Sequence, residues 1–243
     1  MDESWITGII AVKAAVMAGN RAVKTVLLDT EKRSDPGFSA FARRAGEMGH
    51  GVEWLPSQAL QERAGEGCQG AAALVGPRRM KPLAELLTLP QLVLLHGVED
   101  PYNFGHALRS LYAAGVDGVI LPPRNWSTAA CVVARASAGA AEWIPMAQAD
   151  PYEAVTAAKA RGYRFLCADQ DKQAVSLFAA DLQPPLLLAV GGEKRGLNRR
   201  VRALADAYVE IPYGRDFPYA LSTDGAAAVA AFELLRRGRP PSR

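Results

Sequence analysis

From residue 91 onward, hydrophobic and polar residues alternate in a way that predicts strands and helices in turn. Short apolar runs predict buried strands, and apolar residues three and four positions apart predict helices. The predicted strands are 91–97, 117–121, 143–147, 163–168, 186–190 and 207–211, and the predicted helices are 103–114, 128–138, 151–161, 196–204 and a last one ending at Arg237. This alternation predicts a mostly parallel sheet covered by helices on both faces.

The first 77 residues predict a smaller α/β unit built on the same two periodicities. The basic stretch 78–81 that follows has no packing pattern of its own. We therefore predict one domain at 1–77, a linker at 78–90 and a larger domain at 91–243. The predicted elements of the first domain are helix 9–17, strand 23–28, helix 38–48, strand 52–55, helix 58–63 and strand 71–75.

Composition and charge narrow the possible functions. Hydrophobic residues make up 49% and charged residues 22% of the chain, which is typical of a globular protein. The net charge of +3 is mild, so any contact with nucleic acid would come from local basic patches. There is neither a signal peptide nor a membrane-spanning pattern, and the three cysteines show no metal spacing and no disulfide set. We therefore expect a cytoplasmic protein with no metal centre.

Familiar catalytic motifs are missing from the sequence. No nucleophile-elbow, metal-hydrolase or kinase pattern is present, so hydrolysis by a catalytic triad has no support. The histidines, His50, His96 and His106, show no metal spacing, and we expect them to be structural. The chemistry must therefore come from another arrangement.

Three turns with polar residues follow predicted strands, and the first two of them also contain glycine. Strand 91–97 leads to 103–109, strand 186–190 leads to 191–196, and strand 207–211 leads to 219–224. Because open α/β folds bind ligands at the carboxyl ends of their strands, we expect these turns to form one site.

Each turn leaves more than one interpretation open. Asn103 is placed to cap a helix, and Arg109 either pairs with a surface carboxylate or reaches a phosphate or hydroxyl in the cleft. The glycines of 191–196 allow close backbone approach but match neither a P-loop nor a dinucleotide fingerprint. The basic cluster around 194–202 either positions a nucleic acid or forms a solvated helix face; its members are Lys194, Arg195, Arg199, Arg200 and Arg202.

In this order, the turns resemble the motifs of the SpoU/TrmH family of RNA ribose 2′-O-methyltransferases, which belong to the SPOUT superfamily. The resemblance covers most of residues 91–237. Residues 137–140 also match a family stretch, and Gln69-Gly70 before an apolar strand resembles the end of the family's substrate-binding domain. The first motif corresponds to Asn103, Gly105 and Arg109, and the second to Gly191, Glu193 and Gly196.

The third motif departs from the family pattern. The family's Ser-Leu-Asn-Val-Ser corresponds here to residues 220–224, where Leu221 is kept. Ala220 lacks the first hydroxyl, and Ser222 replaces the amide. Ser222 or Asp224 is a candidate to stand in, although Asp224 is equally placed to cap the last helix.

The resemblance implies a SPOUT-type parallel sheet with a carboxyl-terminal trefoil knot, preceded by a small α/β ribosomal-protein-like substrate-binding domain. It implies S-adenosylmethionine bound in the knot and a homodimer that binds structured RNA across its interface. By the same resemblance the catalytic residues are Arg109, Asn103, Glu193 and Ser222, the cofactor-binding residues are Gly191, Gly192, Gly196, Ile211 and Leu221, and the RNA-binding residues are Arg109, Lys194, Arg195 and Arg199.

The function expected from this resemblance is methylation of a ribose 2′-hydroxyl in ribosomal or transfer RNA, with S-adenosylmethionine as methyl donor. The altered third motif leaves an alternative open: an RNA-binding family member that holds the cofactor with weak or no activity. A nucleotide-dependent oxidoreductase is disfavoured because the glycine fingerprint is missing.

Overall fold

The computed structural model describes residues 3–192 and 196–238, which form two compact units. The first unit combines Met1–Arg79 with Asn125–Trp143, and the second combines Met80–Arg124 with Ile144–Arg243. Residues 125–143, which the sequence assigned to the larger domain, therefore pack within the first unit. The assignment of these ranges to an RNA-binding domain, a linker and a catalytic domain stays a prediction.

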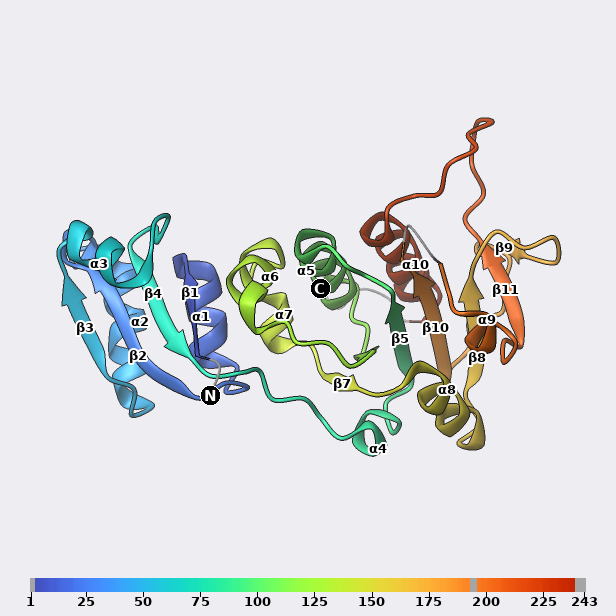
Figure 1. The fold of residues 1–243 in the computed structure, drawn as a ribbon, viewed down its shortest axis with the longest axis horizontal. Coiled ribbons are helices and arrows are strands. Elements are labelled where there is room, and N and C mark those ends of the chain that lie inside the picture. Colours follow the sequence, from blue (N-terminus) through green and yellow to red (C-terminus); the bar gives the residue numbers. More distant parts are fainter. Residues whose placement is uncertain (1–2, 193–195, 239–243) are drawn as a thin grey trace. The chain divides into compact units, whose positions relative to one another are not determined.

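A four-stranded sheet forms the centre of the first unit (Figure 1). Its order is β1-β4-β2-β3, in which only β2 and β3 pair in parallel. The strands are β1 (Ser4–Thr7), β2 (Val23–Asp29), β3 (Val52–Leu55) and β4 (Ala71–Val75). The helices are α1 (Ile9–Met17), α2 (Pro36–Glu47), α3 (Ser57–Ala64), α6 (Ala130–Ala136) and α7 (Ala140–Trp143), with 3-10 turns η1 (Thr30–Lys32) and η2 (Ser127–Ala129).

Segments far apart in sequence share the core of the first unit. Ala134 of α6 is buried in the same cluster as Ile6 and Val12. The predicted helix 128–138 ends earlier, at Ala136, and Ala138 and Gly139 then adopt positive φ values of 48° and 82°. A Cβ at Gly139 would lie 2.5 Å from the Cβ of Ala14, so α1 can approach here only because residue 139 is glycine.

A buried ion pair fixes α7 in the first unit. Arg21 donates from Nε and Nη2 to the two carboxylate oxygens of Glu142, at 2.8 and 3.1 Å, and from Nη1 to the carbonyl of Gly76. The side chains of Arg21 and Glu142 are only 8% and 1% exposed. Arg78 lies close to the same charges, and burial lowers its pKa to about 10, against the opposing influence of Glu142. Glu142 is thus the counter-charge of this cluster.

A seven-stranded sheet forms the second unit, and all of its pairings are parallel. Its order is β7-β6-β5-β10-β8-β11-β9. The strands are β5 (Gln91–His96), β6 (Gly118–Leu121), β7 (Met146–Gln148), β8 (Arg164–Ala168), β9 (Val175–Ser176), β10 (Leu186–Gly191) and β11 (Ala207–Glu210). The helices are α4 (Leu83–Leu86), α5 (Pro101–Ala113), α8 (Pro151–Ala160), α9 (Arg199–Arg202) and α10 (Thr223–Gly238).

The central strands β5 and β10 are buried along almost their whole length, as their continuous apolar runs predict. Helices α5 and α10 pack against each other beside these strands (Figure 1). Between β11 and α10 the chain, drawn in orange to red, leaves the sheet before it returns to begin α10. This excursion carries the third of the polar turns.

The fold class is confirmed: a small mixed α/β sheet precedes a parallel sheet covered by helices. Four short elements, β1, α4, α7 and β9, were not predicted, because each has too few residues to show a periodicity. The predicted strand 143–147 was wrong at its start, since Trp143 ends α7 and the strand begins at Met146. Helix α4 lies within the predicted linker 78–90, where Leu86 and Leu87 are buried in the core of the second unit. The trefoil knot, a property of the full chain path, stays a prediction.

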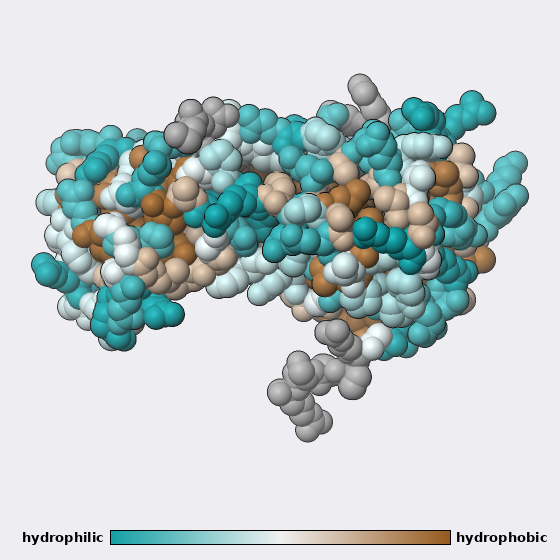
Figure 2. All heavy atoms as spheres, turned by 90° about the horizontal axis from the view of Figure 1, so that it is seen from below, coloured by the Kyte–Doolittle hydropathy of each residue, from teal (hydrophilic) through white to brown (hydrophobic). Residues whose placement is uncertain are grey.

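The exposed surface is mainly polar on the face seen in Figure 2, where hydrophobic side chains show as patches between hydrophilic ones. Among the helices of the described residues, none combines the length and the apolar character needed to cross a membrane.

Replacing Glu142 with alanine should lower the free energy of unfolding by about 3–5 kcal/mol, because the Arg21 guanidinium would stay buried without its counter-charge. Urea unfolding measures this. The matched change Glu53→Ala, which breaks the exposed pair with Arg63, should cost less than about 1 kcal/mol. Equal losses for the two variants would contradict a structural role for the buried pair.

Candidate active site

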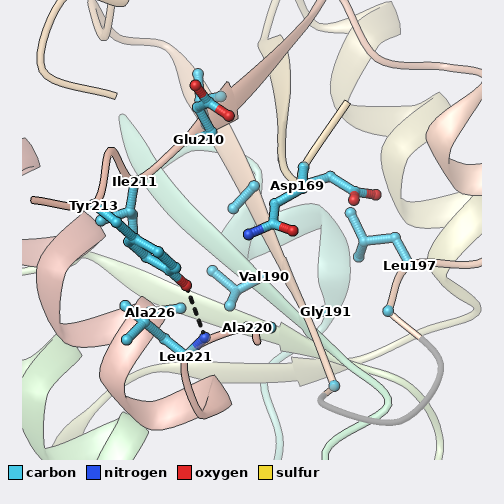
Figure 3. Close-up of a pocket in the computed structure, with 15 residues that line it drawn as sticks. Asp169, Val190, Gly191, Leu197, Glu210, Ile211, Tyr213, Ala220, Leu221 and Ala226 are labelled. Carbon is cyan, nitrogen blue, oxygen red and sulfur yellow. Dashed lines mark hydrogen bonds between the residues drawn. The ribbon is translucent and has the colours of Figure 1, made fainter. Parts of the chain in front are cut away.

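A pocket of about 200 Å³ opens at the carboxyl ends of β8, β10 and β11 (Figure 3). This is the edge of a parallel sheet where open α/β folds bind ligands. It lies entirely within the second unit. Its lining comes from residues 168–170, 190–192, 196–197, 209–211, 213, 220–221 and 226.

The glycine turn after β10 is packed against the end of β5. A Cβ at Gly192 would lie 2.1 Å from the carbonyl oxygen of Gly97, a distance that no side chain could accept. The N–H of Gly196 donates to the carbonyl of Gly192 at 2.8 Å and closes the turn. Nδ1 of His96 lies 3.4 Å from the Gly196 carbonyl, so this histidine contacts the same turn; its structural role stays a prediction. Backbone atoms of the turn therefore form one wall of the pocket.

Tyr213 holds the third turn in place. Its hydroxyl accepts a hydrogen bond from the N–H of Leu221 at 3.1 Å, drawn in Figure 3, and donates to the carbonyl of Tyr219 at 3.2 Å. The Tyr213 ring lines the pocket, and the ring of Phe217 packs between it and Tyr219. Thr223, which follows this turn, donates from Oγ1 to the carbonyl of Gly191 at 3.1 Å. The second and third turns are thus directly linked.

All five residues predicted to bind the cofactor line this one pocket. They lie on two turns that are far apart in the sequence, and the structure brings them together. Their role in binding stays a prediction. They are Gly191, Gly192, Gly196, Ile211 and Leu221.

Of the predicted catalytic residues, Ser222 has a clear local role. Its hydroxyl accepts a hydrogen bond from the N–H of Gly225 at 3.3 Å, as the side chain of a helix N-cap does. Asp224 is therefore not the cap of α10; it lies in the first turn, where its Oδ2 is 3.7 Å from Nδ1 of His106. Glu193, also predicted to be catalytic, lies outside the described residues.

Helix α5 carries the first motif, and it begins earlier than predicted. Asp100, not Asn103, is its N-cap: the Asp100 side chain accepts from the N–H of Asn103 at 2.9 Å. Arg109 is exposed, and its guanidinium has no ion-pair or hydrogen-bond partner among residues 3–192 and 196–238. Neither Asn103 nor Arg109 lines the pocket. The surface ion pair considered for Arg109 is therefore not formed within the described residues.

The predicted basic cluster is divided by the structure. Arg202 pairs with Asp169 and Asp171 at 3.0 and 2.9 Å, so its charge is neutralised locally. The guanidinium of Arg200 stacks 4.5 Å from the ring centre of Tyr152. Arg199 is exposed at the start of α9. Lys194 and Arg195 lie outside the described residues.

Two carboxylates and one thiol complete the surroundings of the pocket. Asp169 and Glu210 line it, and Asp169 is paired with Arg202. Cys167 precedes the lining, but burial raises its pKa to about 12, so it stays a neutral thiol and has no role as a nucleophile. No cluster of three or more metal-ligating side chains occurs among the described residues. The arrangement favours binding an organic ligand through backbone atoms and apolar walls.

Several of the lining residues were not singled out from the sequence, among them Asp169, Glu210 and Tyr213. Asp169 directly follows β8, so the rule that ligands bind at strand ends could have found it. For Tyr213 no sequence signal was available, because its role comes from hydrogen bonds to residues six and eight positions later.

The sequence is similar to those of known RNA methyltransferases. The sequence model of the SpoU rRNA Methylase family matches residues 90–230. A 23S rRNA (guanosine-2'-O-)-methyltransferase, RlmB, of Shewanella oneidensis is 31% identical and aligns with 96% of this chain and 97% of its own. The enzyme of the same name from Xanthomonas campestris is also 31% identical, with 97% of each chain covered.

Solved structures share the fold. An AdoMet-bound rRNA methyltransferase from Sinorhizobium meliloti superposes with a TM-score of 0.80 at 23% identity, covering 98% of this chain and 89% of that one. The SpoU methyltransferase AviRb of Streptomyces viridochromogenes, in complex with AdoMet, gives 0.78 at 22% identity, covering 97% and 90%. With the family model matched over more than half of its length and relatives aligned along nearly all of it, this chain belongs to the SpoU rRNA Methylase family of RNA methyltransferases.

Proposed function

We propose that this protein transfers a methyl group from S-adenosylmethionine to a ribose 2′-hydroxyl of structured ribosomal or transfer RNA. The observation that carries the proposal is the pocket at the carboxyl ends of β8, β10 and β11, where two separate turns meet. All five residues expected to hold the methyl donor lie on its surface. Relatives whose names state methylation of a guanosine 2′-oxygen in 23S rRNA support the choice of reaction.

The pocket suits S-adenosylmethionine chemically. Val190, Leu197 and Ile211 offer apolar walls for the adenosine, and the glycine turn offers backbone N–H and C=O groups for its polar edge. The sulfonium and the ammonium give this ligand a net positive charge at neutral pH. Asp169 and Glu210 place carboxylates at the same pocket, which favours a cation.

S-adenosylmethionine supplies a methyl group on a good leaving group, so the protein mainly aligns the hydroxyl and helps to remove its proton. We assign Arg109 to the reacting hydroxyl or its neighbouring phosphate, because a guanidinium suits phosphate and no described carboxylate neutralises it. Asn103 and Glu193 shape and orient the surrounding turns, and Ser222 fixes the start of α10. These roles rest on the family motifs.

RNA binding would combine several cations of the second unit. Arg109 on α5 and Arg199 on α9 are exposed, and Lys194 and Arg195 are assigned with them. Such contacts go to phosphates and position an RNA without reading its bases. The first 77 residues are assigned to RNA binding as well. Since phosphate contacts are the same in every RNA, other contacts would have to select which RNA is bound.

A homodimer is part of the proposal. Helices α5 and α10, which pack together, leave Tyr102, Tyr112 and Phe232 exposed by 58%, 45% and 51%. Large aromatic side chains on two neighbouring helices are typical of a surface that a second copy covers. Arg109 lies on α5 between the two tyrosines, so RNA that crosses the interface would meet it.

A second candidate is a protein that binds RNA and the cofactor without turnover. Ala220 has no hydroxyl, and the hydroxyl of Ser222 is engaged in capping α10, so neither replaces the reactive groups of the family's third motif. Label from radioactive S-adenosylmethionine that appears in RNA supports the enzyme. Calorimetric binding of the cofactor with no label in RNA supports the second candidate.

Replacing Arg109 with alanine should lower methyl transfer at least about 100-fold, because the hydroxyl or its phosphate loses a positioning cation. The Kd for S-adenosylmethionine should change less than about twofold, since Arg109 does not line the pocket. Transfer of labelled methyl to RNA and calorimetry measure the two. Arg161→Ala, an exposed arginine just before β8 at the opposite edge of the sheet, is the control. Full activity of the Arg109 variant would remove this residue from the mechanism.

Replacing Tyr213 with phenylalanine should weaken S-adenosylmethionine binding about fivefold. The ring stays, but the hydrogen bonds to Leu221 and Tyr219 are lost, and one such bond contributes about 1 kcal/mol. Tyr219→Phe removes a hydroxyl of the same turn that makes no hydrogen bond to the described residues, and it should leave the Kd unchanged. Calorimetric titration compares the two. The same Kd for both variants would show that Tyr213 does not set the turn.

Sedimentation velocity should give the wild-type protein twice its chain mass of 26.0 kDa. Replacing the exposed Phe232 of α10 with glutamate should shift it toward the monomer, because a charge would be buried at the interface. Val175→Glu, on the exposed edge strand β9, should leave the dimer intact. A monomeric wild-type protein at micromolar concentration would refute the proposed dimer.

A further inference from the structure

A histidine and an aspartate face each other across α5 and α10. Nδ1 of His106 lies 3.7 Å from Oδ2 of Asp224, and the two side chains are 49% and 24% exposed. The two residues are 118 positions apart, and the close packing of the two helices brings them together. With Nδ1 turned to Asp224, the other ring nitrogen, Nε2, is the one left for a ligand.

The pair lies at the junction of the three turns. Asp224 is in the first turn of α10, directly after Thr223, whose hydroxyl donates to the carbonyl of Gly191 in the pocket wall. Leu221, three residues before Asp224, lines the pocket. Arg109 is three residues after His106, so the two side chains share one face of α5. His106 itself does not line the pocket; its partner Asp224 connects it to the turn that does.

The charges near His106 suit a group that gains a proton during a reaction. Asp224 faces it from α10 and stabilises an imidazolium, while Arg109, one turn along α5, opposes it. Among the residues of α5, Tyr102, one turn before His106, is the other titratable side chain on this face. Residues 193–195 lie outside the described chain. A histidine beside a carboxylate is an arrangement that proteins use to activate a hydroxyl.

The altered third motif, residues 220–224, explains why a base from another helix would be needed. Ala220 has lost a hydroxyl and Ser222 caps a helix, so the turn itself offers no free basic group. Asp224, which stands where the family has serine, is instead directed at His106. The chain therefore places a candidate base, His106, beside Asp224, the residue at which its third motif departs from the family.

We infer that His106, held by Asp224, accepts the proton of the ribose 2′-hydroxyl during methyl transfer; this rests on the proposed function. The 2′-oxygen forms a bond to the methyl carbon while the carbon–sulfur bond breaks and its electron pair stays on sulfur. The proton passes from the 2′-oxygen to Nε2 of His106. The resulting imidazolium is stabilised by the Asp224 carboxylate and later releases the proton to water. Arg109 holds the neighbouring phosphate.

The test compares single-turnover methyl transfer by the wild type, His106→Gln, Asp224→Asn and the control His50→Gln, from pH 5.5 to 9. Total RNA and labelled S-adenosylmethionine are the probes, and calorimetric binding of S-adenosylmethionine shows that each variant keeps its pocket. Wild-type transfer should rise with pH and then level off, because a base must be unprotonated to accept the hydroxyl proton. His106→Gln should lose about 100-fold or more and lose this rise as well. Asp224→Asn should lose about tenfold, and His50→Gln should match the wild type.

Imidazole in the buffer adds a readout that a structural role would not give. His106→Ala should regain part of its activity as free imidazole is added, and His50→Ala should not respond. The inference is overturned if His106→Gln transfers methyl within about twofold of the wild type, or keeps its pH profile. If the wild type transfers no methyl to RNA although it binds the cofactor, the proposed function itself fails. An active wild type beside an equally active His106→Gln variant refutes only the role of His106.

Discussion

The candidate site depends on the close approach of two backbone turns. Gly192, at the end of β10, lies so near the carbonyl of Gly97 that residue 192 has no room for a side chain. Strands β5 and β10 pair in parallel at the centre of the sheet, so this contact fixes the positions of their carboxyl ends relative to each other. Thr223 then binds the carbonyl of Gly191 and brings the start of α10 to the same place. The pocket, the third turn and the helix pair are positioned relative to this one contact.

Charge is distributed so that two differently charged ligands would meet different parts of the second unit. Carboxylates of Asp169 and Glu210 border the pocket, where a positively charged methyl donor is proposed to bind. The guanidinium of Arg109, which no described carboxylate neutralises, lies on α5, where a polyanion is proposed. Arg202, in contrast, is neutralised by two aspartates and stabilises the fold rather than a ligand. Desolvation and pairing therefore separate structural cations from available ones.

Periodicity predicted the elements that are long enough to show it. Helix 9–17 and strand 71–75 were placed with the bounds that the structure gives, whereas four residues of α4 could not show a helical repeat. The turns at the strand ends could be placed because the edge of a parallel sheet follows from the order of its elements. The facing of His106 and Asp224 could not, since it depends on how two helices far apart in sequence pack. Asp100 rather than Asn103 capped α5 because Pro101 can occupy the first helical position.

The first unit is completed by a stretch of chain that follows β6 of the second. Ala134 is buried in the same core as Ile6, and Glu142 neutralises the Arg21 guanidinium. During synthesis from the amino end, this core stays unfinished until residue 143 has left the ribosome, when β5 and β6 have already been made. The two units therefore fold during overlapping stages of synthesis. A fragment that ends at residue 77 would leave exposed the apolar face that α6 covers, and the Arg21 guanidinium would lack its counter-charge.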